Sequence, residues 1–327
     1  MNSTSRSILA ASAAVLCAFL VASARADSFG SGGNAFTIDF VTIGNPGNAD
    51  DAGAGGGIYS SPYGGVSYSY RMGTYEISQD AITKASASTP ALTNVVAGAW
   101  GASQPAANMT WYEAAAFVNW MNTSTGHQAA YDLSFSGSWS MNLWSSGDAW
   151  QADGENLFRH KDAYYFLPSE NEWYKAAFHK NDGVTVNYWD YATGSNNMPD
   201  GIDFNGDTAF DAVFDQGFSA AAPNAVANVG LTSAYGTFGQ NGNVYEWMES
   251  ANDGINNDSS ESRVFRGGNW VGPESVLRSS VLDNSTPAGQ DTSVGFRVAS
   301  VPEPSCALLM FSASLLSLAR RRRRTAL

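Results

Sequence analysis

The chain is short of cysteine. It has two in 327 residues, Cys17 and Cys306, and each lies close to an end. Residues 27–301 contain none. Neither a disulfide bond, nor a thiolate metal ligand, nor a cysteine nucleophile is therefore expected in the central part of the chain.

Histidine is almost as scarce. His127, His160 and His179 lie far apart and lack the short spacing of metal ligands, so we interpret each as a core or surface residue. No Gly-x-Ser-x-Gly segment is present, and no histidine lies near Ser279 or Ser280 in the sequence. A serine hydrolase triad is therefore not expected.

Positive charge is also low in the central part. Residues 27–301 hold ten Lys and Arg against 29 Asp and Glu, a formal net charge of −19. Such a surface repels nucleic acid and anionic lipid, so no nucleic-acid partner is expected, whereas bound cations are compatible with it. Aromatic residues make up 13% of the chain and charged residues 14%, which predicts a folded protein rather than a disordered one.

Long apolar runs occur only at the ends. At the start, Arg6 precedes an apolar run over Ile8–Ala22, and Ala24-Arg25-Ala26 has the pattern of a cleavage site. We predict a signal peptide over residues 1–26 and a mature chain that begins at Asp27. The alternative is a transmembrane anchor, for which the run is short.

The other end has three parts in a fixed order. Val301-Pro302-Glu303-Pro304 comes first, then the apolar segment Ser305–Ala319, then five arginines, Arg320–Arg324. This order resembles the PEP-CTERM sorting signal of Gram-negative bacteria. The resemblance implies a transient inner-membrane anchor over residues 301–327, processed by an exosortase, and a final location at the cell surface or in the extracellular matrix. A permanent tail anchor is the alternative, with the arginines on the cytoplasmic side.

Between these ends the pattern predicts one α+β domain over residues 27–300. Two helices are expected, Met109–Met121 after Thr110 with Glu113 as a capping box, and Glu170–His179 after Ser169. Residues 85–107 and 122–163 read as loops or irregular chain. Strands are expected over Phe36–Val41, Tyr68–Ile77, Tyr164–Leu167, Gly242–Trp247, Arg263–Trp270 and Gly295–Ala299.

Five segments in a fixed order carry a resemblance to a known family. They are Asn108–Phe117, Phe166–Ala177, Gly242-Asn243-Val244-Tyr245-Glu246-Trp247, Arg266-Gly267-Gly268-Asn269-Trp270 and Gly295-Phe296-Arg297. Together they resemble the formylglycine-generating enzymes, also called sulfatase-modifying factor domains. The resemblance implies a single α+β domain, related to C-type lectins, with short strands and long irregular loops. The tryptophans Trp111, Trp173, Trp247 and Trp270 are predicted to be mostly core residues.

The catalytic cysteines of that family are missing here. The resemblance implies two thiolates after the Gly-Gly-x-Trp segment, which bind copper and engage the substrate thiol. The first position falls at or near Leu277 and the second near Ser280 to Leu282. Because neither leucine nor serine is a ligand for Cu(I), no copper and no formylglycine-generating activity are expected.

Calcium is the other ion that the resemblance implies. One site maps to the backbone oxygens of Gly242 and Val244 and to the Glu246 carboxylate, which are oxygen ligands of the kind calcium prefers. The resemblance implies an Asp or Asn ligand three residues before Gly242, where this chain has Gly239. A second site would use Asp203 and Asp215. The alternative is that these acids are solvated turn residues.

These observations predict an exported surface or matrix protein whose domain is non-catalytic and binds a glycan or a peptide. Its ligand groove is expected beside Leu277, at Asn269, Trp270, Glu274 and Arg278. The alternative is a cysteine-independent enzyme that uses the same groove on an exported substrate. The expected partners are signal peptidase, an exosortase and an exopolysaccharide or peptide ligand, with membrane contact only through the tail.

Overall fold

A computed structural model of the chain describes residues 25–53, 62–95, 98, 100–201, 209–216 and 222–301. The apolar run of the predicted signal peptide and the predicted tail from residue 302 onward lie outside the described residues. Within the described ranges, no helix is long and apolar enough to cross a membrane. Signal peptide and sorting tail therefore stay predictions from the sequence.

A five-stranded antiparallel sheet joins the first, middle and last parts of the domain. Its order is β1, β2, β3, β13, β8, so the last strand lies between two that precede it in sequence. The strands are β1 (Arg25–Phe29), β2 (Phe36–Ile43), β3 (Tyr70–Gly73), β8 (Tyr165–Phe166) and β13 (Ala299–Ser300).

The first residue of the predicted mature chain is fixed in this sheet. Asp27 lies in β1, where its carboxylate accepts hydrogen bonds from the Arg71 guanidinium at 2.7 and 3.1 Å and from the Tyr165 hydroxyl at 2.8 Å. Arg71 itself is buried in β3. Cleavage after Ala26 would leave this ion pair in place.

A second sheet carries three of the five family segments. Its order is β11, β10, β9, β12, with β12 parallel to β9 and the other pairs antiparallel. Two hairpins, β4–β5 and β6–β7, complete the strands of the described residues. The bounds are β4 (Asp132–Phe135), β5 (Trp139–Asn142), β6 (Ala149–Trp150), β7 (Asn156–His160), β9 (Tyr245–Ala251), β10 (Arg263–Arg266), β11 (Asp283–Ser285) and β12 (Val294–Phe296).

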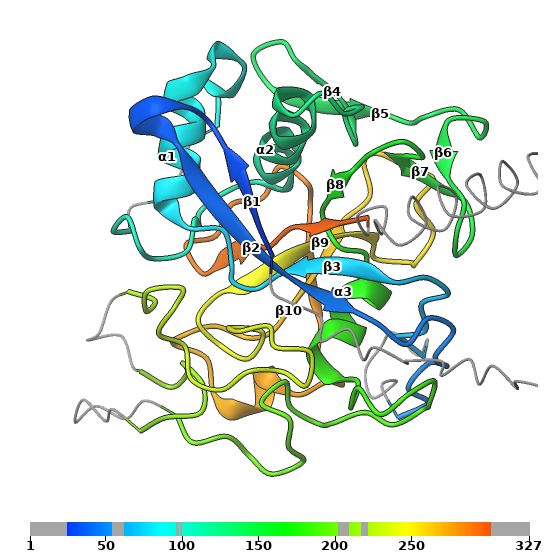
Figure 1. Cartoon of the computed structure of the whole chain (residues 1–327), viewed down its shortest axis with the longest axis vertical. Coiled ribbons are helices and arrows are strands. Elements are labelled where there is room, and N and C mark those ends of the chain that lie inside the picture. Colours follow the sequence, from blue (N-terminus) through cyan, green and yellow to red (C-terminus); the bar gives the residue numbers. More distant parts are fainter. Residues whose placement is uncertain are drawn as a thin grey trace, which may run out of the picture.

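The α-helices are α1 (Gln79–Ser88), α2 (Trp111–Ser124) and α3 (Glu170–Phe178). In Figure 1, α1 and α2 lie above strands β3 and β9, and α3 lies below them. Both predicted capping boxes are present, Thr110 with Glu113 and Ser169 with Glu172. Each cap satisfies backbone N–H groups that the first turn leaves free, which is worth about 1 kcal/mol.

The predicted element bounds need correction at several places. Helix α1 was not expected, because Ala, Ser and Thr over residues 85–107 read as a loop; Ser78 caps it and Ile82 and Ala85 bury its inner face. The two hairpins lie in a stretch, 122–163, that the sequence pattern left irregular. The strand expected over Gly242–Trp247 is β9, which begins later, at Tyr245, and ends at Ala251. The strand expected over Arg263–Trp270 is β10, which ends at Arg266.

The core confirms the prediction for the four tryptophans. Trp111, Trp173 and Trp247 are at most 1% exposed, and Trp270 is buried. The indole of Trp111 donates to Met248 O at 2.9 Å, and that of Trp247 donates to Met109 O at 3.0 Å. These two reciprocal bonds tie the start of α2 to β9.

Candidate functional site

A packed side chain, Leu277, fills the first position at which the family resemblance implies a thiolate. Leu277 ends a 3₁₀ helix, Glu274–Leu277, and is 1% exposed. It packs in a buried cluster with Tyr191, Ala212 and Phe214. A Cβ added at Gly268, where φ is +77°, would stand 2.5 Å from Leu277 Cδ2, so the backbone approaches this side chain as only glycine allows.

No copper ligand is present at this place. Leucine has no donor atom, and the neighbouring Ser279 is buried with its backbone N–H donating to Asp190 O at 2.9 Å. Cu(I) prefers soft sulfur ligands, and residues 27–301 have no cysteine to supply one. The residues at this position therefore do not fit the copper centre that the family resemblance implies.

The four predicted groove residues make different contacts. Glu274 pairs with Arg278 at 2.8 Å on the surface, and it also accepts a hydrogen bond from the Tyr191 hydroxyl. The Asn269 side chain accepts from the backbone N–H groups of residues 271 and 272, which closes a turn. Trp270 lies instead in a separate cluster with Val213 and Val244.

Two buried donors near Trp270 lack an acceptor. The backbone N–H of Gln216 donates to Trp270 O at 2.9 Å, which places these residues side by side. Within the described ranges, neither the Gln216 Nε2 group nor the Trp270 Nε1 group has a hydrogen-bond partner. A buried donor left without a partner costs about 1–3 kcal/mol, so these groups favour a ligand oxygen or a water molecule nearby.

The Glu246 carboxylate is already bound by other side chains. It is fully buried and accepts from Trp173 Nε1 at 2.7 Å and from Arg297 Nε and Nη2 at 2.5 and 2.6 Å. Three donors thus occupy an acceptor with about four lone-pair directions, and Arg297 brings a permanent positive charge. The residues present do not fit a calcium ion bound through this carboxylate, a point that chelation can test directly.

A second buried carboxylate stands beside the predicted calcium position. Glu76 is 3% exposed and accepts from Asn243 Nδ2 at 2.8 Å and from the Val244 N–H at 3.3 Å. A Cβ at Gly239 would lie 3.1 Å from its Oε2 atom, so Glu76 occupies the space of the acid missing there. Burial, and then the charge of Glu246, raise the pKa of Glu76 well above its ordinary value.

The second predicted calcium site is only half described. Asp203 lies outside the described residues. Asp215 is exposed, has a φ of 51° and donates its backbone N–H to Gly272 O at 3.0 Å. Across the part of the chain that the structure describes, no three His, Cys, Asp or Glu side chains form a group suited to a metal ion.

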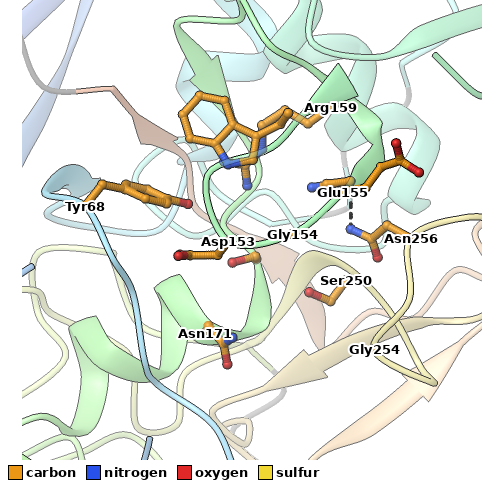
Figure 2. Close-up of a pocket in the computed structure, with 12 residues that line it drawn as sticks. Tyr68, Asp153, Gly154, Glu155, Arg159, Asn171, Ser250, Gly254 and Asn256 are labelled. Carbon is orange, nitrogen blue, oxygen red and sulfur yellow. Dashed lines mark hydrogen bonds between the residues drawn. The ribbon is translucent and has the colours of Figure 1, made fainter. Parts of the chain in front are cut away.

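The sequence did not predict a polar cavity that is lined in part by the buried Arg159. Its volume is about 110 Å³, room for only a few water molecules. Arg159 donates to Glu172 at 2.8 and 3.0 Å and to Glu249 at 2.7 and 3.0 Å. Figure 2 shows side chains from several elements around the same space. They include Tyr68, Asp153, Glu155, Asn171, Ser250 and Asn256.

One cation, Arg159, faces four carboxylates here: Glu172 and Glu249, which it contacts, and Asp153 and Glu155 in the lining. Burial would raise the pKa of Glu172, but Arg159 and the Tyr68 hydroxyl hold it below its ordinary value. Burial outweighs Arg159 at Glu249 and raises its pKa. No histidine lines the cavity. The arrangement links β7, α3 and β9 through Arg159, and its cavity has room for small polar groups only.

The fold is a single α+β domain in which the tryptophans of the Gly-Asn-Val-x-Glu-Trp and Gly-Gly-x-Trp segments are buried. This combination indicates the class of protein to which the chain belongs. The model of the sulfatase-modifying factor enzyme 1-like domain matches residues 66–301, and the chain belongs to this family. No curated protein sequence matches the chain.

Several solved structures share the fold. "Treponema denticola variable protein 1" is 21% identical, with a TM-score of 0.59, over 85% of this chain and 99% of that one. CarF is 19% identical, with a TM-score of 0.54, over 81% and 99% of the two chains. PvdO from Pseudomonas aeruginosa is 16% identical, with a TM-score of 0.51, over 84% and 98%. At these identities the likeness shows the fold alone.

Proposed function

We propose that this protein is an exported binding module whose domain has kept the family fold without the family's oxidase chemistry. The observation that carries the proposal is Leu277. A buried leucine, packed against Gly268 and Phe214, stands where a thiolate would be needed. Without sulfur, neither copper nor a substrate thiol has a ligand there.

The ligand of this module is a glycan or a peptide. The unpartnered donors of Trp270 and Gln216 support a ligand with acceptor oxygens, which both classes offer. The net charge of −19 over residues 27–301 disfavours polyanions and leaves neutral saccharides and neutral or basic peptides. Export to the cell surface or matrix, through the predicted signal peptide and tail, would place the module where exopolysaccharide occurs.

Arrays of glycans and peptides, probed with the purified chain, test this proposal. We expect retention of a saccharide or peptide, and the mass of the retained compound should be unchanged after long incubation. A compound that leaves the protein with an altered mass would indicate an enzyme and contradict the proposal. Failure to retain any member of either array would also contradict it.

A further inference from the structure

A second, larger cavity includes part of the family segment Asn108–Phe117 but none of residues 242–270. It has a volume of about 290 Å³ and is open to solvent. It lies between the start of α2 and the tip of the hairpin β4–β5, which stand beside each other in Figure 1. Its lining consists of Asn94, Thr110, Tyr112, Glu113, Phe135, Gly137, Ser138, Trp139, Ala288 and Gln290.

Three aromatic rings form the apolar part of this cavity. Phe135 and Trp139 pair across the hairpin turn, with ring centroids 5.1 Å apart at 67°. Phe135 is 43% exposed, and it is the one aromatic residue among the exposed large hydrophobic side chains of the described residues. Tyr112, at the start of α2, supplies the third ring. Rings exposed at a hairpin tip offer flat apolar faces that cost little entropy to bind.

The polar part of the cavity has one charged side chain, which is already hydrogen-bonded. Glu113 is 3% exposed and accepts from Thr110 N at 2.7 Å and from Thr110 Oγ1 at 2.9 Å, so its charge caps α2. The Gln290 amide donates to the same carboxylate at 3.4 Å, which leaves its carbonyl for another donor. No Lys or Arg lines the cavity. Amides beside aromatic rings suit hydroxyl groups rather than a charged ligand.

An indole donor at this cavity also lacks a partner. Within the described part of the chain, Trp139 Nε1 donates to no acceptor and is covered from solvent. A ligand hydroxyl that reached this indole would give the donor an acceptor oxygen. The cavity thus combines stacking faces, amide groups and an unsatisfied donor.

We infer that this cavity binds a neutral saccharide of one or two pyranose units. The C–H faces of the sugar would stack on Phe135, Trp139 and Tyr112, and its hydroxyls would meet the amides of Asn94 and Gln290. The absence of a cation in the lining and the acidic surface disfavour anionic sugars. This inference rests on the proposed function, in that it names the saccharide as the ligand and the hairpin tip as its site.

The experiment measures binding of the full chain to neutral oligosaccharides of glucose, galactose, mannose and N-acetylglucosamine, by calorimetry and by tryptophan fluorescence. We expect Phe135→Ala and Trp139→Ala to weaken the binding at least tenfold. Because Phe135 is 43% exposed, its removal should cost only about 1 kcal/mol of stability, so this variant keeps the test valid if the Trp139 variant folds poorly. Val184→Ala, at a side chain 63% exposed and absent from the lining, is the matched control.

The outcomes separate this inference from the proposed function. Saccharide binding that both hairpin variants keep would overturn the cavity as the site and leave the binding module intact. Binding of peptides but of none of these oligosaccharides would contradict the inference that the ligand is a saccharide, and the proposed function as a binding module would still hold. Retention of neither class would overturn both.

Discussion

The buried ion pair between Glu246 and Arg297 offers the sharpest test of how this fold is held together. Both side chains have 0% exposure, and their atoms approach to 2.5 and 2.6 Å. Replacing the carboxylate by the amide of Glu246→Gln keeps the shape but leaves the Arg297 charge without its partner. Removing one member of a buried pair costs about 3–5 kcal/mol.

That loss is large enough to measure by thermal unfolding. For a domain of this size, about 1 kcal/mol shifts the melting temperature by about 2–4 °C, so Glu246→Gln should lower it by about 6–20 °C. The matched control is Asp80→Asn, whose exposed pair with Lys84 should be worth less than about 1 kcal/mol. Both variants are melted by calorimetry or circular dichroism, with and without a calcium chelator.

The chelator distinguishes the ion pair from the predicted calcium site. If Arg297 is the partner, the loss caused by Glu246→Gln is the same with and without chelator, and the parent chain melts at one temperature in both. A ligand that binds only the folded state would instead raise the melting temperature of the parent in its presence. A parent that melts lower in chelator, together with a variant that does not respond to it, would refute the reasoning.

Four further predictions follow from other residues. Leu277→Ala should cost about 2–5 kcal/mol in urea or thermal unfolding, against less than about 0.5 kcal/mol for the exposed Leu231→Ala; equal costs would contradict the packed position of Leu277. Burial lowers the pKa of Lys175 from 10.5 to about 8, so the unfolding free energy should rise from pH 8 toward 10 and stay flat in Lys175→Met. Because the pKa of Glu76 is raised in the folded protein, its contribution to the unfolding free energy is fully present below pH 4.5 and is lost as the pH rises through the folded-state pKa. Glu76→Gln should abolish this dependence of the unfolding free energy on pH. Intact mass of the protein from its native envelope should show neither Met1 nor Leu327; a species that keeps either would overturn the predicted processing.

The sequence predicted those parts of the fold that local chemistry specifies. Thr110 with Glu113, and Ser169 with Glu172, are caps that a four-residue pattern determines, and both are present. Large indoles bury wherever the fold allows, so the core positions of Trp111 and Trp247 followed from residue type. Helix α1 was missed although Ser78 is an N-cap residue and Ile82 and Ala85 fall on one face, because the Ala, Ser and Thr residues that follow were interpreted as a loop.

The sites depended on contacts between distant parts of the chain. Arg159 binds Glu172 and Glu249, thirteen and ninety positions away, and no spacing rule predicts such a group. Glu76 reaches the space beside Gly239 from a segment more than 160 residues earlier, so the sequence showed a missing acid where the structure supplies one. The cavity at the hairpin tip could not be predicted for the same reason, because Phe135 and Trp139 form it only together with residues of α2.

The proposed loss of the family's oxidase chemistry is tested most directly by an aldehyde assay. The purified chain is incubated with copper and a Cys-x-Pro-x-Arg peptide, and the peptide is then analysed by mass spectrometry. The account predicts no aldehyde, whereas a Leu277→Cys, Ser280→Cys double variant that gains copper binding would show that the geometry of the site is retained. Aldehyde formed by the unmodified chain would contradict the account, because residues 27–301 have no thiol with which to form it.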